Sequence, residues 1–159
     1  MSAPTVQQFF EAPLIAQQLE APDHDAVVVA ALALAERYTM DVSQPAAPRF
    51  VWAADAREVV LAPGEHQPLA TSPGNFWVAA GCIDPGDGAG GLMIEDPRLA
   101  TAAAGVPGLD VTTEPPAETV APVAGELMLF QAFLRHGFVN PGAAPQRWIL
   151  VGLRPKAVR

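Results

Sequence analysis

Apolar residues follow two different patterns along the chain. Over residues 25–38, alanine, leucine and valine dominate, and alanine and leucine have high helix propensity. Asp23 or Asp25 can cap the start of this segment, where negative charge interacts favourably with the helix dipole, and Arg37 lies near its end. The pattern therefore predicts one α-helix over residues 25–38.

From residue 50 onward, short apolar runs alternate with turn signals, which is typical of β-strands. Gly- and Pro-containing stretches predict turns at 84–91 and 140–142, and a Pro- and Ala-rich stretch predicts a long loop over 99–123. One helix followed by several short strands predicts a β-sandwich or barrel with a helical flank. The predicted strands are residues 50–52, 58–61, 75–83, 91–94, 125–130 and 147–153.

Length and composition narrow the class of protein. The 159 residues predict a single domain over 1–159, because one domain takes about 150 residues. Half of the residues are hydrophobic and 16% are charged, against about 25% in an average domain, which excludes disorder as the overall class. The net charge of −8 and the lack of a Lys/Arg run argue against a nucleic-acid partner.

The same sequence predicts a soluble, cytoplasmic protein without a membrane partner. Cys82 is the single cysteine, so neither an internal disulfide nor a Cys-based zinc site can form. Residues 1–11 lack the basic and apolar regions of a signal peptide. The longest apolar run, residues 26–35, is too short to cross a bilayer, which takes about 20 residues.

The C-terminal third carries a family resemblance. Residues 125–142 read GELMLFQAFLRHGFVNPG, and RWILV follows from Arg147. This pattern resembles the closing strands of the non-haem iron, 2-oxoglutarate-dependent oxygenases. The resemblance places His136 at the family's distal iron ligand and Arg147 at the arginine that pairs with the 2-oxoglutarate carboxylate. Imidazole is a good Fe(II) ligand, and a guanidinium group can hold a carboxylate through two hydrogen bonds.

Two further segments extend the resemblance toward the N-terminus. GLMIEDPR (residues 91–98) and FEAPL (residues 10–14) are similar to segments of one bacterial branch of this superfamily. The resemblance implies a mainly β fold. The fold expected is a double-stranded β-helix (jelly-roll, cupin-like) with one N-terminal helix packed outside.

The other two iron ligands of that branch are missing here. PGEHQPLATSP (residues 63–73) aligns with the segment that carries them, and the ligand positions become Ala70 and Ser72. Alanine has no donor atom, a neutral serine hydroxyl is a weak ligand, and a lone imidazole should not hold Fe(II) against water. We therefore expect an oxygenase fold that has lost its iron site and uses no cofactor.

If the alignment is shifted by a few residues, an active iron and 2-oxoglutarate oxygenase stays an alternative function. His66 lies four residues before Ala70 and could then reach the metal. A facial triad needs two histidines and one carboxylate, so Glu65, Asp84 or Glu95 would have to supply the third ligand.

Without a metal, the pocket in which the resembled oxygenases hold their iron would be an apolar cavity, with His136 and Arg147 at its edge. Such a pocket predicts redox-neutral chemistry on a small, largely apolar molecule, namely cyclisation, isomerisation or elimination, for example in specialised metabolism. His136 would act as a general acid or base and Arg147 would anchor a carboxylate or enolate. The expected substrate-binding residues are Trp77, Phe138, Glu65 and His66.

Each assignment competes with a structural role. His136 can be hydrogen-bonded to backbone, Arg147 can form a surface ion pair, and Trp77 and Phe138 can be core residues. Arg135 is expected to be solvated. A non-catalytic binding or partner protein on the same scaffold is the alternative function, and an apolar patch that pairs with itself would give a homodimer. The remaining structural assignments are a buried Cys82, an exposed His24 and a turn with a local ion pair at Asp96-Pro97-Arg98.

Overall fold

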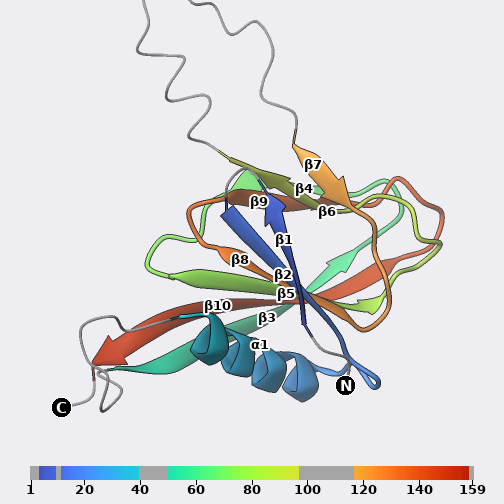
Figure 1. The fold of residues 1–159 in the computed structure, drawn as a ribbon. Coiled ribbons are helices and arrows are strands. Elements are labelled where there is room, and N and C mark those ends of the chain that lie inside the picture. The colour runs from blue at the N-terminus through green and yellow to red at the C-terminus, as the bar shows by residue number, and fades with distance from the viewer. Residues whose placement is uncertain (1–3, 10–11, 40–49, 97–116, 158–159) are drawn as a thin grey trace, which may run out of the picture.

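The computed structural model describes residues 4–9, 12–39, 50–96 and 117–157. These residues form two antiparallel β-sheets that face each other, and a single helix lies on the outer side of the larger sheet (Figure 1). The arrangement is mainly β and confirms the predicted jelly-roll class. In the part of the chain that is described, no helix is both long and apolar enough to cross a membrane.

The larger sheet has the strand order β1-β2-β8-β5-β10-β3, and the smaller sheet has the order β4-β9-β6-β7. All neighbouring strands are antiparallel. The larger sheet contains β1 (Thr5–Phe9), β2 (Ala12–Gln18), β3 (Phe50–Leu61), β5 (Trp77–Asp84), β8 (Glu126–Gln131) and β10 (Gln146–Ala157). The smaller sheet contains β4 (His66–Ala70), β6 (Gly91–Glu95), β7 (Glu118–Val120) and β9 (Arg135–Val139).

The helix α1 (His24–Tyr38) confirms the predicted segment to within one residue. Asp23 is its N-cap, and a carboxylate oxygen of Asp23 accepts a hydrogen bond of 2.7 Å from the backbone N–H of Ala26. The helix packs closely on the sheet because Gly81 of β5 has no side chain. A Cβ at that position would lie 2.7 Å from a methyl carbon of Val27.

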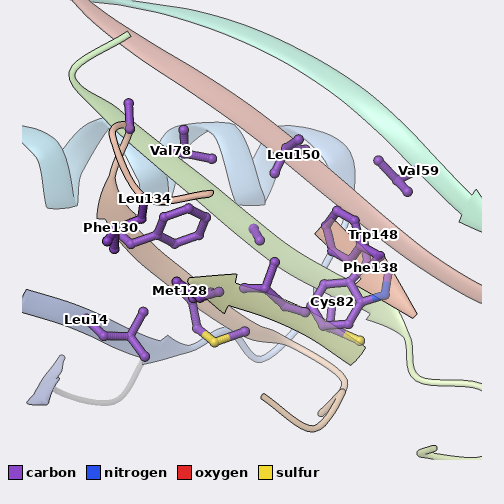
Figure 2. Close-up of a cluster of buried hydrophobic side chains, with 14 of the residues drawn as sticks. Leu14, Val59, Val78, Cys82, Met128, Phe130, Leu134, Phe138, Trp148 and Leu150 are labelled. Atoms are coloured by element: carbon purple, nitrogen blue, oxygen red, sulfur yellow. The ribbon is translucent and has the colours of Figure 1, made fainter. Parts of the chain in front are cut away.

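Successive side chains of β10 point alternately into two hydrophobic cores. Trp148 and Leu150 belong to an inner core between the sheets, whereas Ile149 and Val151 belong to an outer core under α1. This is the period of two expected for a strand buried on both faces. Figure 2 shows the inner core, in which aliphatic and aromatic side chains from both sheets fill the space between them.

Five strands of the structure correspond to predicted runs, and five other strands were not predicted. The runs 50–52 and 58–61 are parts of one strand, β3, so their separation was wrong. β7 lies inside the predicted loop 99–123, which is therefore not entirely loop, while residues 99–116 of that loop are outside the described part. The unpredicted strands are β1, β2, β4, β7 and β9.

Candidate functional site at the mouth of the barrel

His136 lies on β9 and faces the space between the sheets. His136 is 6% exposed, and its imidazole ring packs edge-to-face on Phe130, with 5.3 Å between the two ring centroids. Nδ1 is 3.1 Å from the backbone oxygen of Leu134. A carbonyl oxygen can only accept, so Nδ1–H donates and the lone pair of the neutral ring is on Nε2. No described residue forms a hydrogen bond with Nε2, so this atom is free to act as a base or ligand.

Burial keeps the His136 ring neutral. Desolvation is the main cause that lowers the pKa of His136 below its usual value, and the positive charge of Arg57 lowers it further. The hydrogen bond to Leu134 acts in the opposite direction but does not reverse the shift. At neutral pH, therefore, Nε2 is an unprotonated nitrogen close to a guanidinium group.

This lowered pKa predicts a pH-dependent stability. The unfolded chain takes up a proton at this residue near pH 6.5, whereas the folded chain resists it, so lowering the pH from 7.5 to 5.5 reduces the free energy of unfolding. We expect His136→Gln to remove this pH-dependent loss of unfolding free energy. The loss amounts to up to about 1.4 kcal/mol for each unit by which the pKa of His136 differs between the folded and the unfolded chain. Urea unfolding at several pH values measures it, with His66→Gln, an exposed histidine, as control. An unchanged slope in His136→Gln would contradict the assignment.

Arg57 is a functional candidate that was not predicted from the sequence. It lies on β3 opposite Leu150 of β10, and Asp55 lies opposite Gly152, so both charged residues are on the inner face of the sheet. Both are exposed, which places them at the open end of the space between the sheets. No described residue forms a hydrogen bond or ion pair with the Arg57 guanidinium group, so it is available to an anion.

A small cavity joins these residues. Its volume is about 120 Å³, and its lining consists of Asp55, Arg57, Ser72, Asn75, Leu150 and Gly152. Gly152 makes room for Asn75, because a Cβ at Gly152 would collide with the Asn75 carboxamide. His136 does not line this cavity, and what links it to the cavity is the positive charge of Arg57, which acts on the His136 ring and lowers its pKa. We call Asp55, Arg57, Ser72, Asn75 and His136 together the mouth site.

The donor set of the mouth site does not fit iron. Ala70 of β4 is directly opposite His136 of β9 in the strand register, and Ser72 follows two residues later. Neither supplies a strong ligand. Within the described ranges, no group of three His, Cys, Asp or Glu residues could hold a metal ion. We therefore derive no chemical step through a metal here.

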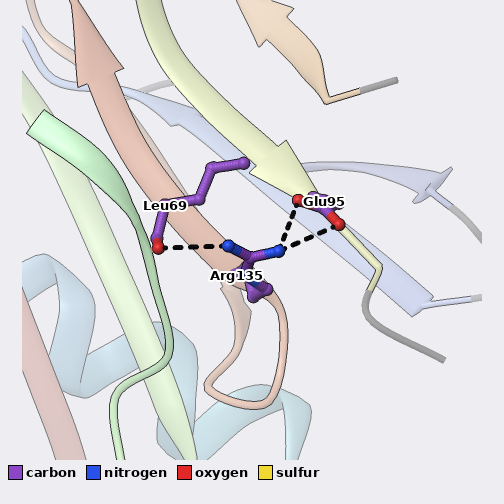
Figure 3. A network of polar contacts seen from close by, with 3 residues as sticks. All are labelled: Leu69, Glu95 and Arg135. Carbon is purple, nitrogen blue, oxygen red and sulfur yellow. Dashed lines mark hydrogen bonds and ion pairs between the residues drawn. The ribbon is translucent and has the colours of Figure 1, made fainter. Parts of the chain in front are cut away.

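The residues proposed to rebuild a metal site lie elsewhere. His66 is exposed and pairs with Val139, so it faces away from the inner side on which His136 lies. Glu95 is buried on the outer side of the smaller sheet and accepts hydrogen bonds of 3.2 and 3.3 Å from Arg135 (Figure 3). The Arg135 side chain is 41% exposed, in line with the expected solvated residue, and its ion pair also neutralises the buried Glu95 carboxylate.

Arg147 does not point into the barrel. It follows the inward-facing Gln146 and precedes the inward-facing Trp148, so strand alternation turns its side chain to the outer face. There its guanidinium group lies 2.7 Å from a carboxylate oxygen of Glu58, in an exposed ion pair. The expectation of an interior anchor at Arg147 was wrong, and the surface ion pair is what the structure shows.

The other expected binding residues are also apart from the mouth site. Glu65 accepts a hydrogen bond of 2.8 Å from the N–H of Ala62 in the turn before β4. Trp77 belongs to the outer core, and its indole N–H donates to Thr39 at 2.8 Å. Phe138 packs in the inner core, 5.2 Å from Trp148. Trp77 and Phe138 are therefore core residues, which is the structural role given above as their alternative.

Three minor expectations concern single residues. Cys82 is buried, and burial raises its pKa to about 12, which makes its thiol inert and confirms a small buried hydrophobe. His24 is exposed, as expected. Asp96 is buried, whereas Pro97 and Arg98 lie outside the described residues.

Comparison with solved structures confirms the fold. An oxidoreductase of the 2OG-Fe(II) oxygenase family from Burkholderia pseudomallei matches 96% of this chain and 73% of its own, with a TM-score of 0.54 and 7% identity. This chain has the same fold. The fold that the resemblance implied is thus confirmed.

Other matches are weaker. A Pseudomonas putida prolyl-4-hydroxylase matches with a TM-score of 0.46 and 14% identity over 65% of this chain, which spans about half (52%) of that protein. The sugar epimerase NovW from Streptomyces spheroides matches with a TM-score of 0.44 and 12% identity over 99% of this chain and 70% of its own. No family model and no curated protein matches the sequence.

Proposed function

We propose that the mouth site binds a small monocarboxylate and moves a proton on it without a metal or an organic cofactor. The observation that carries the proposal is an uncommitted imidazole nitrogen, His136 Nε2, within the electrostatic reach of an uncommitted guanidinium group, Arg57. Neither group has a described hydrogen-bond partner for these atoms. A base beside an anion-binding cation is the pair that proton abstraction next to a carboxylate or carbonyl requires.

The size and charge of the site restrict the ligand. A volume of about 120 Å³ holds about four water molecules, at about 30 Å³ each, so it accommodates only the reacting end of a small molecule. Asp55 lines the same cavity as Arg57 and disfavours a second negative charge. A carboxylate bound by Arg57, with Ser72 and Asn75 as further hydrogen-bonding groups, fits this balance better than a phosphate.

The proposed reaction is an isomerisation that leaves the redox state unchanged. His136 Nε2 takes a proton from the carbon next to the carbonyl or carboxylate group. The C–H electron pair moves into that group as an enolate, whose negative charge Arg57 stabilises. The same Nε2–H then returns the proton to the other face or to a neighbouring carbon, so no electrons or atoms are gained or lost.

Solvent deuterium exchange tests this proposal without knowledge of the natural substrate. Chelator-treated protein is incubated in D2O with short 2-oxo and 3-oxo acids, and loss of the C–H signal is followed by NMR. We expect exchange above the protein-free rate and a loss of at least about 100-fold in His136→Gln. Arg57→Gln should weaken acid binding by about tenfold, the equivalent of about 1.4 kcal/mol for one charge-assisted contact. Arg154→Gln, at an exposed arginine on β10, the strand next to β3, is the matched control.

The outcomes separate the alternatives. Binding that depends on Arg57 without any exchange would favour the non-catalytic binding protein on the same scaffold. Exchange that persists in His136→Gln would overturn the assigned base. The family resemblance assigned the carboxylate contact to Arg147, so Arg147→Gln is measured beside Arg57→Gln. A larger loss of acid binding in Arg147→Gln would favour Arg147 over Arg57 as the carboxylate contact.

A further inference from the structure

A second hollow lies outside the barrel, along α1. It is a groove of about 700 Å³ that shares no lining residue with the mouth site. α1 packs mainly on β3, β8 and β10, so the angle between the helix and β2 stays open. Small side chains of the helix, Ala26, Ala30 and Ala33, form one wall, and Val29 beside them is 66% exposed.

Gln17 of β2 is the uncharged polar residue that lines this groove, and the charged residues Glu20 and Arg37 line it too. Gln17 is 7% exposed, lies on the face of β2 that carries the buried Ile15, and lines the groove with its side chain. No described residue forms a hydrogen bond with its carboxamide. The neighbouring Gln18, by contrast, donates to the backbone oxygen of Ala124 at 2.8 Å. The carboxamide atoms are not among the fully buried atoms that lack a partner, so they keep contact with the groove. A hydrogen-bonding group that enters the groove can therefore replace water on Gln17.

We propose that the α1–β2 groove binds an uncharged, mainly apolar small molecule with a carbonyl or amide group, which hydrogen-bonds to Gln17. The volume lies within the range of about 300–1,000 Å³ found for small-molecule pockets, and an apolar wall with a few polar groups is their usual lining. Glu20 and Arg37 of the lining carry opposite charges, so the groove favours neither an anion nor a cation. The site is independent of the function proposed for the mouth site.

Methyl and amide NMR of the labelled full chain tests the groove directly. The probes are 2-naphthamide and 2-methylnaphthalene, which share an apolar body and differ in the amide. We expect 2-naphthamide to shift the methyl signals of Val29, Ala30 and Ala33 together with the side-chain amide signal of Gln17. It should bind about five- to tenfold more tightly than 2-methylnaphthalene, which is the range of one net hydrogen bond of about 1 kcal/mol.

Three variants make the result specific. Gln17→Leu should keep the melting temperature or raise it, bind both probes, and lose the preference for the amide. Val29→Asp should abolish binding without unfolding the chain, because Val29 is exposed; Val51→Asp, at a 54% exposed valine of β3, is the matched control. Arg57→Gln should leave probe binding unchanged, which separates this proposal from the mouth site.

Several outcomes would overturn the proposal. These are equal affinity for the two probes in the wild type, shifts scattered over the surface, and binding that survives Val29→Asp. A response to a short apolar peptide but none to 2-naphthamide would also overturn it, since the groove would then be a peptide site.

Discussion

The double substitution Ala70→His, Ser72→Asp is expected to create a divalent-metal site in a protein that we expect to bind Fe(II) only weakly. Ala70 is directly opposite His136 across β4 and β9, and Cβ atoms of such pairs are about 4.5–5.5 Å apart. Two imidazoles at this separation and a carboxylate two residues further along complete the two-histidine, one-carboxylate set that Fe(II) prefers. We expect Fe(II) affinity to rise by at least about 100-fold, or about 2.7 kcal/mol.

Anaerobic calorimetry of chelator-treated protein with Fe(II), with and without 2-oxoglutarate, measures this gain. The wild type should show no tight binding in either condition. Adding His136→Ala to the double variant should remove the gained affinity, which shows that the third ligand is His136. Ala70→His, Glu95→Asp serves as a control of similar composition, because Glu95 lies on the outer side of the smaller sheet.

Two results would contradict the proposed loss of the iron site. Tight binding by the wild type that 2-oxoglutarate strengthens would mean that ligands have been rebuilt, and would direct the search to hydroxylation substrates. A double variant that folds but gains no affinity would mean that residues 63–73 do not occupy the ligand-bearing position inferred for them.

The sequence was most informative where a single pattern decides the local structure. The helix was predicted to within one residue because an N-cap and a run of strong helix formers agree. The register of β4 was harder to predict. That strand has the sequence HQPLA, with Pro68 in its middle, and a bulge between Gln67 and Ala70. Its apolar and polar residues therefore do not alternate in the way that marks a strand in a sequence.

The site shows why the spacing of a family pattern does not fix the direction of a side chain. His136 is an inner residue of β9, and its role as a base stays a prediction. Arg147 has a plausible spacing from it, but the buried Trp148 takes the inward position and turns Arg147 outward. A shift of one residue moves a strand side chain to the opposite face, so spacing alone cannot settle the orientation.

Arg57 was missed for a related reason. Residues 53–57 separate two of the predicted strands, 50–52 and 58–61, although they are the middle of the twelve-residue strand β3. The alternation of Arg57, Val59 and Leu61 does contain the signal, because Val59 and Leu61 are both buried in the inner core. Applied to this segment, period-two reasoning places Arg57 on the inner face.

The inner core also changes the interpretation of where an apolar ligand could bind. The sequence predicted an apolar cavity inside the barrel, whereas the described residues there pack together and the cavity at the mouth is small and polar. The larger apolar hollow is outside, along α1. Polar catalysis at the mouth and apolar binding at the helix are therefore assigned to different parts of the fold.

Trp148→Ala is expected to lower the free energy of unfolding by about 3–5 kcal/mol. Trp148 is fully buried between the sheets, its ring centroid lies 5.2 Å from that of Phe138, and its indole N–H donates to Gln146 at 3.3 Å. Removing the indole leaves a cavity that a rigid two-sheet scaffold cannot close. Urea unfolding measures the loss, and Trp52→Ala is the matched control, because Trp52 is half-buried on the outer face and no described residue accepts a hydrogen bond from its indole N–H.

The same variant decides whether the barrel interior is a packed core or a ligand pocket. If it is packed, added indole should refill the cavity of Trp148→Ala and raise its melting temperature in a concentration-dependent way, while the wild type should not respond. A loss below about 1 kcal/mol, no larger than an ordinary surface substitution, would mean that the space around Trp148 is loosely filled. In that case an apolar ligand would belong inside the barrel beside His136, and the substrate sought for the mouth site would have to be larger and less polar than a short monocarboxylate.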